Sequence, residues 1–585
     1  MIPALIATIT LSIPAASETS LASSRSAATV PPNVLAQQSR PLSITPPDFS
    51  PEPSPQTPEP LPPLPPPEEL LPLPSEPESL PPGFDVPGTI TVEAFRVVGS
   101  TVFSPAELEA VTASYTNRPI TFAELFEVRS AITQLYIDAG YITTGAFIPA
   151  DQIVDEGIVE IQVVEGFLEE VFVEGRTELV PGYLSSRIER AAGQPLNVNS
   201  LVEGLQLLQL SPLIETISAE LATGTQVGGS LLNVQVQEAR SFNVQVALDN
   251  GRSPTVGSFR RQASFENINL RGYGDALRVA YSNTDGSNTA DVSYAVPVSP
   301  ANTLIGGNFS LTRSKVIDED FEILDISSES EDIQLFVRHP FIQTPTEELA
   351  LGLELSYSRS RSTFQLPDQP RLGFPFTGAP DGEAKVTAIR FSQEWIRRSA
   401  NRALSARSSF SLGLDWFGAT QNPGDIPDSN FFSWQGQAQW VEVLAPDTLL
   451  LARVNGQIAD RPLLSTEQFR IGGLGSVRGY REDRVIGDNG VFASLEARVP
   501  ILRIPEWESV VQITPFVDAG YSWNSGDRPD PDPQSLASVG AGILWQVSDR
   551  LTARLDYGIP LVNRDSRGDS LQEQGILFSV SGSLF

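Results

Sequence analysis

Residues 349–357 read Leu-Ala-Leu-Gly-Leu-Glu-Leu-Ser-Tyr, and residues 511–521 read Val-Gln-Ile-Thr-Pro-Phe-Val-Asp-Ala-Gly-Tyr. In both stretches most of the apolar residues alternate with small or polar ones. Because successive side chains of a β-strand point to opposite faces, this period of two predicts strands with one apolar and one polar face. The same rhythm runs from about Phe242 to Phe585. Many such strands, with polar inner faces and no long apolar helix, predict an outer-membrane β-barrel.

Sixteen antiparallel strands fit into residues 241–585, and an even number is what a single-chain bacterial barrel requires. We expect them near 242–249, 256–266, 275–282, 289–298, 304–312, 332–341, 349–358, 385–395, 409–417, 431–443, 448–459, 490–501, 510–523, 535–547, 551–557 and 575–585.

The connections between these strands alternate in length. Several of those after even-numbered strands are tight, as at 299–303 and 445–447, and most of those after odd-numbered strands are longer and polar, as at 359–384 and 460–489. Short periplasmic turns and long outer loops are the usual asymmetry of outer-membrane barrels. A soluble β-sandwich would not show this alternation.

Composition narrows the classes of function. The chain has 585 residues, enough for several domains, and no Cys, which suits a cell envelope and excludes thiolate metal sites. His339 is the only histidine, and neither Lys315 nor Lys385, the only lysines, follows a glycine, so there is no phosphate-binding loop of the Gly-Lys-Ser/Thr kind. The net charge of −32 argues against nucleic acid. We predict no catalytic residue, no metal site and no cofactor.

Two segments precede the first folded region. Residues 1–16 are apolar and end in small residues, like part of a signal peptide, and they lack the usual basic start, which would then be expected upstream. Residues 17–88 are predicted to be a disordered, proline-rich linker, because residues 41–90 hold 19 of the 49 prolines. Proline cannot join a helix interior or a sheet ladder, so an extended spacer is expected. A recognition motif for a proline-binding domain is the alternative.

Residues 89–166 and 167–240 each show the order β-α-α-β-β. In the first unit, Ser104 with Glu107 and Thr121 with Glu124 form capping boxes that start two helices. Phe122, Leu125, Ile132, Leu135 and Tyr136 are predicted to line the buried side of the second helix. The second unit is expected to have strands at 167–173, 213–221 and 230–238, and helices at 182–191 and 200–210.

This order resembles the POTRA module, the polypeptide-transport-associated domain. The residues that match the pattern of a first POTRA in two-partner secretion transporters, the TpsB group that includes FhaC and ShlB, are Gly140, Tyr141, Pro149, Gln152, Gly157, Glu165 and Gly166. Two POTRA modules ahead of a sixteen-stranded barrel are also that group's layout, and the resemblance covers residues 89–585. It implies periplasmic POTRA domains that capture an unfolded client, partly by adding a strand to a sheet edge. A spacer that sets barrel geometry is the alternative.

The loop after the eleventh strand contains Phe-Arg-Ile-Gly-Gly-Leu-Gly-Ser-Val-Arg-Gly-Tyr at residues 469–480. It resembles the sixth outer loop of the BamA/TpsB superfamily, whose tip is Arg-Gly-aromatic, here Arg478, Gly479 and Tyr480. The resemblance implies that loop 460–489 folds into the lumen as a lock or gate. It also implies that the tip arginine binds the aspartate of a Phe-x-Asp-x-Gly strand motif, here Phe516, Asp518 and Gly520.

The strand pattern supports this pairing. Asp518 shares the polar phase of its strand with Gln512, Thr514 and Ser522, so its carboxylate should face the lumen. A guanidinium and a carboxylate form two parallel hydrogen bonds, which fix orientation as well as position. A second copy, Arg-Gly-Tyr at residues 271–273, falls in a short periplasmic turn and is interpreted as turn chemistry only.

Phe585 ends the last strand and is interpreted as a signal to the barrel assembly machinery. Its phase differs from that of the apolar set Ile576, Phe578, Val580 and Leu584, which leaves open the face that it presents. Relatives of FhaC can carry an N-terminal helix that plugs the pore. We expect no stable plug helix here, because residues 41–90 are rich in proline and residues 17–40 lack an apolar stripe.

These features predict a protein-export channel in the outer membrane of a Gram-negative cell, with its POTRA domains in the periplasm. The expected partners are a secreted exoprotein client, the barrel assembly machinery and outer-membrane lipid, without nucleic acid. The channel would pass its client to the surface without nucleotide. A BamA-like insertase, a chloroplast-type import channel and, less well matched, a passive porin stay open as alternatives. A barrel enzyme lacks a placed nucleophile and base.

Overall fold

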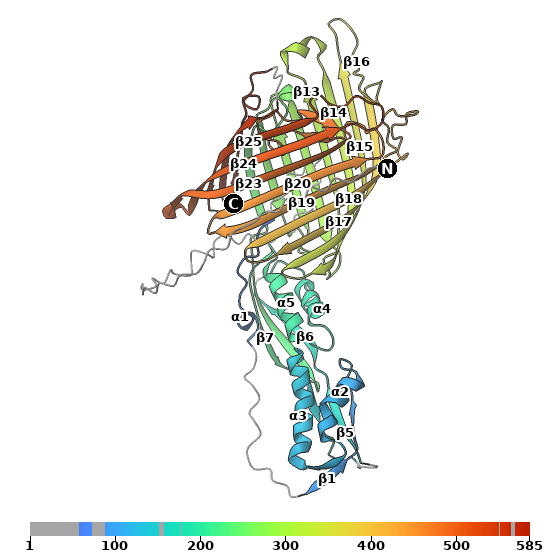
Figure 1. Ribbon diagram of the computed structural model, residues 1–585, viewed down its shortest axis with the longest axis vertical. Coiled ribbons are helices and arrows are strands. Elements are labelled where there is room, and N and C mark those ends of the chain that lie inside the picture. Colours follow the sequence, from blue (N-terminus) through green and yellow to red (C-terminus); the bar gives the residue numbers. More distant parts are fainter. Residues whose placement is uncertain are drawn as a thin grey trace, which may run out of the picture. The chain divides into compact units, whose positions relative to one another are not determined.

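The computed structural model describes residues 58–72, 88–150, 152, 157–175, 177–548, 550–562 and 568–584 (Figure 1). The signal segment 1–16, the absence of a plug helix in residues 17–40 and the role of Phe585 concern residues outside these ranges. Among the described residues, no helix has both the length and the apolar character that crossing a membrane requires.

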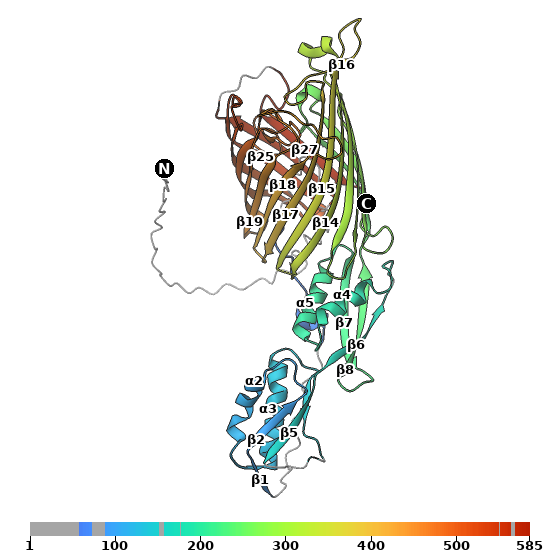
Figure 2. The ribbon, with the colours of Figure 1, turned by 90° about the vertical axis from the view of Figure 1, so that its right-hand side faces the viewer.

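The first α+β unit has two small sheets. The strand β2 runs parallel to β5, which pairs with the edge strand β4, and β1 pairs with β3. Figure 2 shows α2 and α3 beside the sheet that contains β2 and β5. The elements are β1 (Thr89–Val92), β2 (Ala94–Val98), α2 (Pro105–Thr112), β3 (Arg118–Thr121), α3 (Phe122–Asp138), β4 (Gly145–Phe147) and β5 (Ile158–Val164).

Both predicted capping boxes are present at the starts of α2 and α3. Tyr136 and Ile132 of α3 are fully buried, as the helical spacing predicted, and pack with Ile161 of β5. The prediction for Phe122 is wrong, because its side chain is 40% exposed. Phe122 is the first residue of α3, and the buried residues of this helix begin three positions later, at Leu125.

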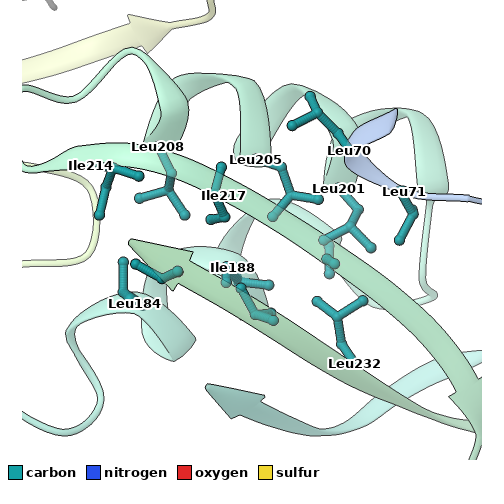
Figure 3. Close-up of a cluster of buried hydrophobic side chains, with 14 of the residues drawn as sticks. Leu70, Leu71, Leu184, Ile188, Leu201, Leu205, Leu208, Ile214, Ile217 and Leu232 are labelled. Atoms are coloured by element: carbon teal, nitrogen blue, oxygen red, sulfur yellow. The ribbon is translucent and has the colours of Figure 1, made fainter. Parts of the chain in front are cut away.

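The second α+β unit has the sheet order β6-β8-β7, with β6 parallel to β8. Its helices and its strands β7 and β8 together supply most of one large apolar cluster (Figure 3). The elements are β6 (Phe167–Glu174), α4 (Tyr183–Ala192), α5 (Val198–Gln209), β7 (Ile214–Thr223) and β8 (Gly229–Glu238).

Two residues of the proline-rich segment belong to the same cluster. Residues Pro67–Leu70 form the short helix α1, and Leu70 and Leu71 are each 1% exposed. The prediction of an extended, disordered spacer is therefore wrong at this point. Proline is tolerated in the first turn of a helix, where its missing N–H costs nothing, and Pro67 occupies that position.

The barrel is closed, and all sixteen predicted strands are present as neighbouring antiparallel strands. The last strand, β27, pairs with the first, β9, and the two-residue strand β16 (Leu372–Gly373) is an addition beside β15. The long strands are β9 (Phe242–Asp249), β10 (Arg260–Asn267), β11 (Ala276–Asn283), β12 (Ser287–Pro297), β13 (Leu304–Lys315), β14 (Ser327–Gln343), β15 (Glu347–Phe364), β17 (Glu383–Arg398), β18 (Arg402–Leu414), β19 (Phe432–Ala445), β20 (Thr448–Ala459), β23 (Asn489–Ile504), β24 (Ser509–Trp523), β25 (Ser535–Val547), β26 (Leu551–Pro560) and β27 (Ile576–Ser583).

Some strands are longer than predicted, notably at the outer ends of β14 and β15. These extensions carry polar residues on both faces, so the apolar-polar alternation that predicted the strands stops before the ladder does. Cross-strand ion pairs stabilise these extensions, as between Arg313 and Glu329 at 3.3 Å and between Arg359 and Glu383 at 2.8 Å.

Strand β24 shows how the barrel wall is built. Gln512, Thr514 and Ser522 are buried on the inner side, whereas Ile513 and Val517 are exposed on the outer side, where the bilayer would lie. The predicted orientation of this strand is therefore correct, and it presents Asp518 to the inside.

Candidate functional site: the loop against the inner wall

The connection between β20 and β23 folds back onto the barrel. It contains a small hairpin of β21 (Phe469–Ile471) and β22 (Val485–Gly487). An apolar cluster joins this loop to inward-facing residues of the wall, and its members are Phe469, Ile471, Val477, Tyr480, Val485, Phe492 and Leu536. Loop 460–489 therefore lies against the inner faces of β23, β24 and β25.

At the tip of the loop, Arg478 is in contact with Asp518. It donates two parallel hydrogen bonds, from Nε to Oδ2 at 2.7 Å and from Nη2 to Oδ1 at 2.8 Å, and its backbone N–H donates to Oδ2 at 3.1 Å. The guanidinium carbon lies 3.5 Å from the centroid of the Phe516 ring. Only a planar, forked cation makes both contacts at once.

Further charges complete a network around this pair. Arg478 Nη1 donates to Glu496 at 2.5 Å and lies 3.9 Å from Asp556. Arg554 pairs with both of these carboxylates, and Arg498 pairs with Glu496 at 3.0 Å. Three arginines thus face three carboxylates, counting the aspartate of strand β24. Because each buried charge has opposite partners, none bears the full cost of desolvation alone.

Gly479 allows the tip to touch the wall. Its φ is +91°, and a Cβ on it would lie 2.8 Å from the carbonyl group of Gly558 in β26. A Cβ on Gly558 would in turn lie 2.6 Å from the backbone nitrogen of Gly479. The two backbones are in direct contact, which explains why glycine follows the arginine.

The aromatic and glycine members of the two motifs hold the loop from either side. The Tyr480 hydroxyl donates to the carbonyl oxygen of Ala537 at 2.9 Å and accepts from the backbone N–H of Val562 at 3.1 Å. On β24, a Cβ on Gly520 would lie 2.9 Å from Ile471 of the loop hairpin. All six residues predicted for this site therefore lie at one contact between loop and wall.

Comparison with known proteins places the chain in a family. The sequence model described as "Haemolysin secretion/activation protein ShlB/FhaC/HecB" matches residues 228–544, more than half of the chain, and the one described as "POTRA domain, ShlB-type" matches residues 90–166. The chain belongs to the ShlB/FhaC/HecB family. Members of this family are outer-membrane transporters and not enzymes, so the predicted class and location of the protein are correct.

A curated relative is named as an outer membrane transporter, and two solved structures share the fold. The outer membrane transporter CdiB of Dickeya dadantii is 22% identical over 486 residues, which cover 80% of this chain and 83% of the relative. The solved structure of CdiB from Escherichia coli has a TM-score of 0.65 at 20% identity and covers 87% of this chain and 93% of its own. BamA from Haemophilus ducreyi, solved without POTRA domains 1–3, has a TM-score of 0.50 at 16% identity, covering 84% of this chain and 100% of its own.

In this transporter of the ShlB/FhaC/HecB family, some residues that hold loop 460–489 in place were not predicted from the sequence. Asp488 is fully buried just before β23, and its Oδ1 accepts from the Leu463 backbone N–H at 3.0 Å, from Gln468 at 2.9 Å and from Arg528 at 3.1 Å. It therefore holds both ends of the loop together. A lone aspartate after Ile-Gly gives no signal in the sequence that separates it from a solvated acid.

A second ion pair ties the loop to a distant part of the wall. Arg390 Nη2 on β17 donates to both carboxylate oxygens of Glu467 at 2.7 Å. Between β17 and β24 lie β18, β19, β20 and β23, so the two ion pairs of this loop hold well-separated strands. Neither residue belongs to a motif, because a charge on a strand and a charge in a loop meet only after folding.

We expect the substitution Glu467→Ala to loosen the first half of the loop and open the lumen. Arg390 would lose its closest carboxylate and keep Glu354, whose carboxylate lies 3.9 Å away, the Ser356 hydroxyl and the more distant charge of Asp332. Removing one partner of a buried ion pair leaves the other charge buried without compensation, which destabilises the docked loop. The open fraction of single channels in planar bilayers should therefore rise at least about threefold.

Asp460→Ala is the matched control: it removes an acid at the start of the same loop whose side chain is 42% exposed and whose partners are Arg461 and the Phe432 backbone N–H. Wild-type conductance in Glu467→Ala would show that this pair does not hold the obstruction.

The predicted POTRA residues lie in two places. Gly140 and Gly166 are at the junction with the second POTRA unit, where their carbonyl oxygens accept from the backbone N–H of Val198 and Leu196 at 2.9 and 2.8 Å. Tyr141 packs edge-on against Tyr136 in the core. These residues shape the first domain and its joint.

Pro149, Gln152 and Gly157, three more of the predicted POTRA residues, lie near the start of β5. Gln152 donates to the carbonyl oxygens of Pro149 and Glu160 and accepts from the Glu160 N–H at 2.7 Å. Gly157 has a φ of +71°, and its carbonyl oxygen accepts a hydrogen bond from the backbone N–H of Glu93 at 2.8 Å.

Glu165 makes the densest contacts of the signature. Its Oε1 accepts from the backbone N–H of Thr101 at 2.6 Å, from the N–H of Val102 at 3.1 Å and from the Tyr136 hydroxyl at 2.9 Å. Its other oxygen accepts from the Thr101 hydroxyl. Burial raises the pKa of Glu165, but these hydrogen bonds outweigh it, and the pKa lies below its usual value.

The second Arg-Gly-Tyr copy does more than shape a turn, so that interpretation is wrong. Arg271 does stabilise the turn, through its N–H and side chain to Asp275. However, the carbonyl oxygen of Gly272 accepts from the N–H of Val180 in the second POTRA at 2.8 Å. A Cβ on Gly272 would lie 2.6 Å from the carbonyl oxygen of Glu178, so glycine is needed for this close approach.

Proposed function

We propose that this transporter captures one secreted polypeptide in the periplasm, passes it in an extended state through the barrel and uses loop 460–489 as a gate. The observation that carries the proposal is the buried Arg478–Asp518 pair, which fastens the loop to the inner wall of a barrel that follows two POTRA domains. A passive pore needs neither capture domains nor a loop held across several strands.

The POTRA sheets offer edges for capture. Strand β4 lies at the edge of the first sheet and β6 at the edge of the second. Phe147 of β4 is 46% exposed and Phe172 of β6 is 41% exposed. An extended chain that adds a strand to either edge would find backbone partners and an apolar side chain beside them. This supports capture over a mere spacer.

The names of the relatives indicate what kind of protein this transporter exports. They are named outer membrane transporter CdiB and heme/hemopexin transporter protein HuxB, and others are named hemolysin transporters. We infer that the client of this chain is a large secreted protein, and that its folding outside the cell drives transport without nucleotide. The barrel assembly machinery would insert the transporter, and outer-membrane lipid would surround it.

The test is secretion of a candidate exoprotein, for which a large exoprotein encoded next to this gene would be the first choice. Co-expression with the whole chain in a Gram-negative host should release the exoprotein to the surface or the medium, whereas the empty vector should leave it in the periplasm. The insertase alternative makes the opposite prediction, namely that loss of the chain lowers the amounts of other outer-membrane barrels. That outcome, with no effect on the exoprotein, would overturn the export assignment.

A further inference from the structure

The proline-rich segment ends in a buried pair of leucines. Leu70 and Leu71 are each 1% exposed and belong to the apolar cluster of the second POTRA. Figure 3 shows them beside Leu201 and Leu205 of helix α5, and α1 also contacts strand β7. The segment therefore occupies an apolar groove between α5 and β7, which we call the α5/β7 groove.

The other end of the segment reaches the barrel. The backbone N–H of Leu61 donates to the carbonyl oxygen of Ser399 at 3.0 Å, and the carboxylate of Glu59 attracts Arg398. Ser399 lies in the tight turn between β17 and β18, on the same side of the barrel as the POTRA domains by strand direction. Residues 58–71 thus connect the second POTRA to a periplasmic turn.

The sequence of this segment suits a ligand. Seven of the fourteen residues 58–71 are proline, which fixes φ and lowers the entropy lost on docking. Pro67 then starts a single helical turn, closed by the bond from the Leu71 N–H to the Pro67 carbonyl oxygen at 2.8 Å. This turn places the two leucines in the groove, while Glu68 and Glu69 remain exposed.

The groove does not depend on the segment for its core. Apart from Leu70 and Leu71, every buried member of the cluster lies between Leu179 and Val236, within the second POTRA itself. The second POTRA therefore keeps a core of its own when the two leucines leave. The free energy gained by burying two leucines is also small compared with the conformational entropy that fourteen residues lose when they become ordered. The docked state should therefore open readily.

We propose that residues 58–71 are a reversible intramolecular ligand of the α5/β7 groove, a strap that ties the second POTRA to the barrel turn at Ser399 and leaves when the transporter works. Because the strap is tethered, its effective concentration at the groove is high, and it rebinds after each opening. This regulatory role rests on the proposed function, whereas the reversible docking does not.

Thiol labelling tests the reversibility in the whole, otherwise Cys-free chain. Leu71→Cys and Leu205→Cys place single thiols in the same cluster, one on the strap and one on α5. A maleimide should react with Leu71→Cys at least about 100-fold faster, because opening the strap costs less than unfolding the domain. Equal rates at the two positions would show that the strap opens only with the POTRA core, and would overturn the proposal.

A second measurement uses a fluorescein-labelled peptide of residues 58–72. The double variant Leu70→Ser/Leu71→Ser should leave the groove vacant, so the whole-chain variant should bind this peptide at least about 100-fold more tightly than the wild type does. Glu68→Gln/Glu69→Gln, altered at exposed positions of the same turn, is the matched control and should behave like the wild type. A peptide with serine at both leucine positions should not bind. No binding to the folded double variant would overturn the proposal.

Secretion then tests the regulatory role. In the double variant Leu71→Cys/Leu201→Cys, a short reversible thiol cross-linker between the two cysteines would lock the strap. Secretion of the exoprotein should fall about tenfold and recover with reductant, because a locked strap removes the open state. Unchanged secretion by the locked chain would overturn the role. A wild type that secretes nothing would instead refute the proposed function and leave the labelling result intact.

Discussion

Replacing Arg478 with alanine is expected to lower secretion of the client at least about tenfold at equal amounts of barrel in the outer membrane. The change leaves Asp518 fully buried without the cation that gives it two parallel hydrogen bonds. Breaking a buried pair from one side costs about 3–5 kcal/mol, since the other charge is stranded. The cost falls on the docked loop and not on the strand ladders, so the barrel should insert normally. Immunoblots of exoprotein and of heat-modified barrel measure both quantities.

Companion variants separate the pair from the charge. Asp518→Ala should resemble Arg478→Ala, and the double variant should be little worse than either, because both lose one interaction. Arg478→Lys should fail in part, since an ammonium group cannot form the planar fork. Arg470→Ala removes an arginine whose side chain is 35% exposed and whose partners, Asp483 and the Ser465 carbonyl oxygen, lie within the loop itself, so this variant should secrete nearly as the wild type does. Normal secretion by Arg478→Ala would remove the gating role and leave the family assignment untouched.

The barrel was predictable because its signal is repeated in every strand. Inner and outer faces alternate over sixteen strands, and tight turns mark every second connection, so errors at single boundaries do not add up. The alternation of apolar and polar residues arises because one face of each strand contacts lipid. The errors in strand length therefore fall beyond the apolar band, in the outer parts of β14 and β15, where charge pairs such as Arg359 with Glu383 stabilise the strands.

The site was predictable only in part. Arg478 and Asp518 stand out because two short motifs resemble those of a known superfamily, and the strand phase of Asp518 agrees. Asp488 and the Arg390–Glu467 pair have no motif, and nothing local distinguishes them from solvated charges. The strap was missed for a different reason. Proline content predicts an extended chain, but two leucines at its end decide whether that chain finds a groove.

Replacing Glu165 with alanine is expected to destabilise the first POTRA by about 2–4 kcal/mol, the second large effect. The carboxylate accepts hydrogen bonds from Thr101, Val102 and Tyr136, so it joins the loop after β2, helix α3 and the end of β5. Hydrogen bonds to a charged group contribute about 1.5–3 kcal/mol each, and their losses overlap. Because the barrel contributes little helical signal, thermal loss of circular dichroism at helical wavelengths in the whole chain reports the POTRA domains. The exposed Glu109 of α2 provides the control Glu109→Ala, which should melt like the wild type.

The same carboxylate should make the first POTRA sensitive to acid. The folded-state pKa of Glu165 is lowered from its ordinary 4.5, so its stabilisation is fully present above that value and is lost as the pH falls through the folded-state pKa. The POTRA melting temperature of the wild type should therefore drop between about pH 5 and about pH 3. Glu165→Gln keeps one acceptor oxygen but cannot titrate, so its melting temperature should start lower and fall less over this range. If Glu165→Gln showed the full wild-type dependence on pH, other carboxylates would cause the acid sensitivity, and Glu165 would contribute hydrogen bonds without the benefit of its charge.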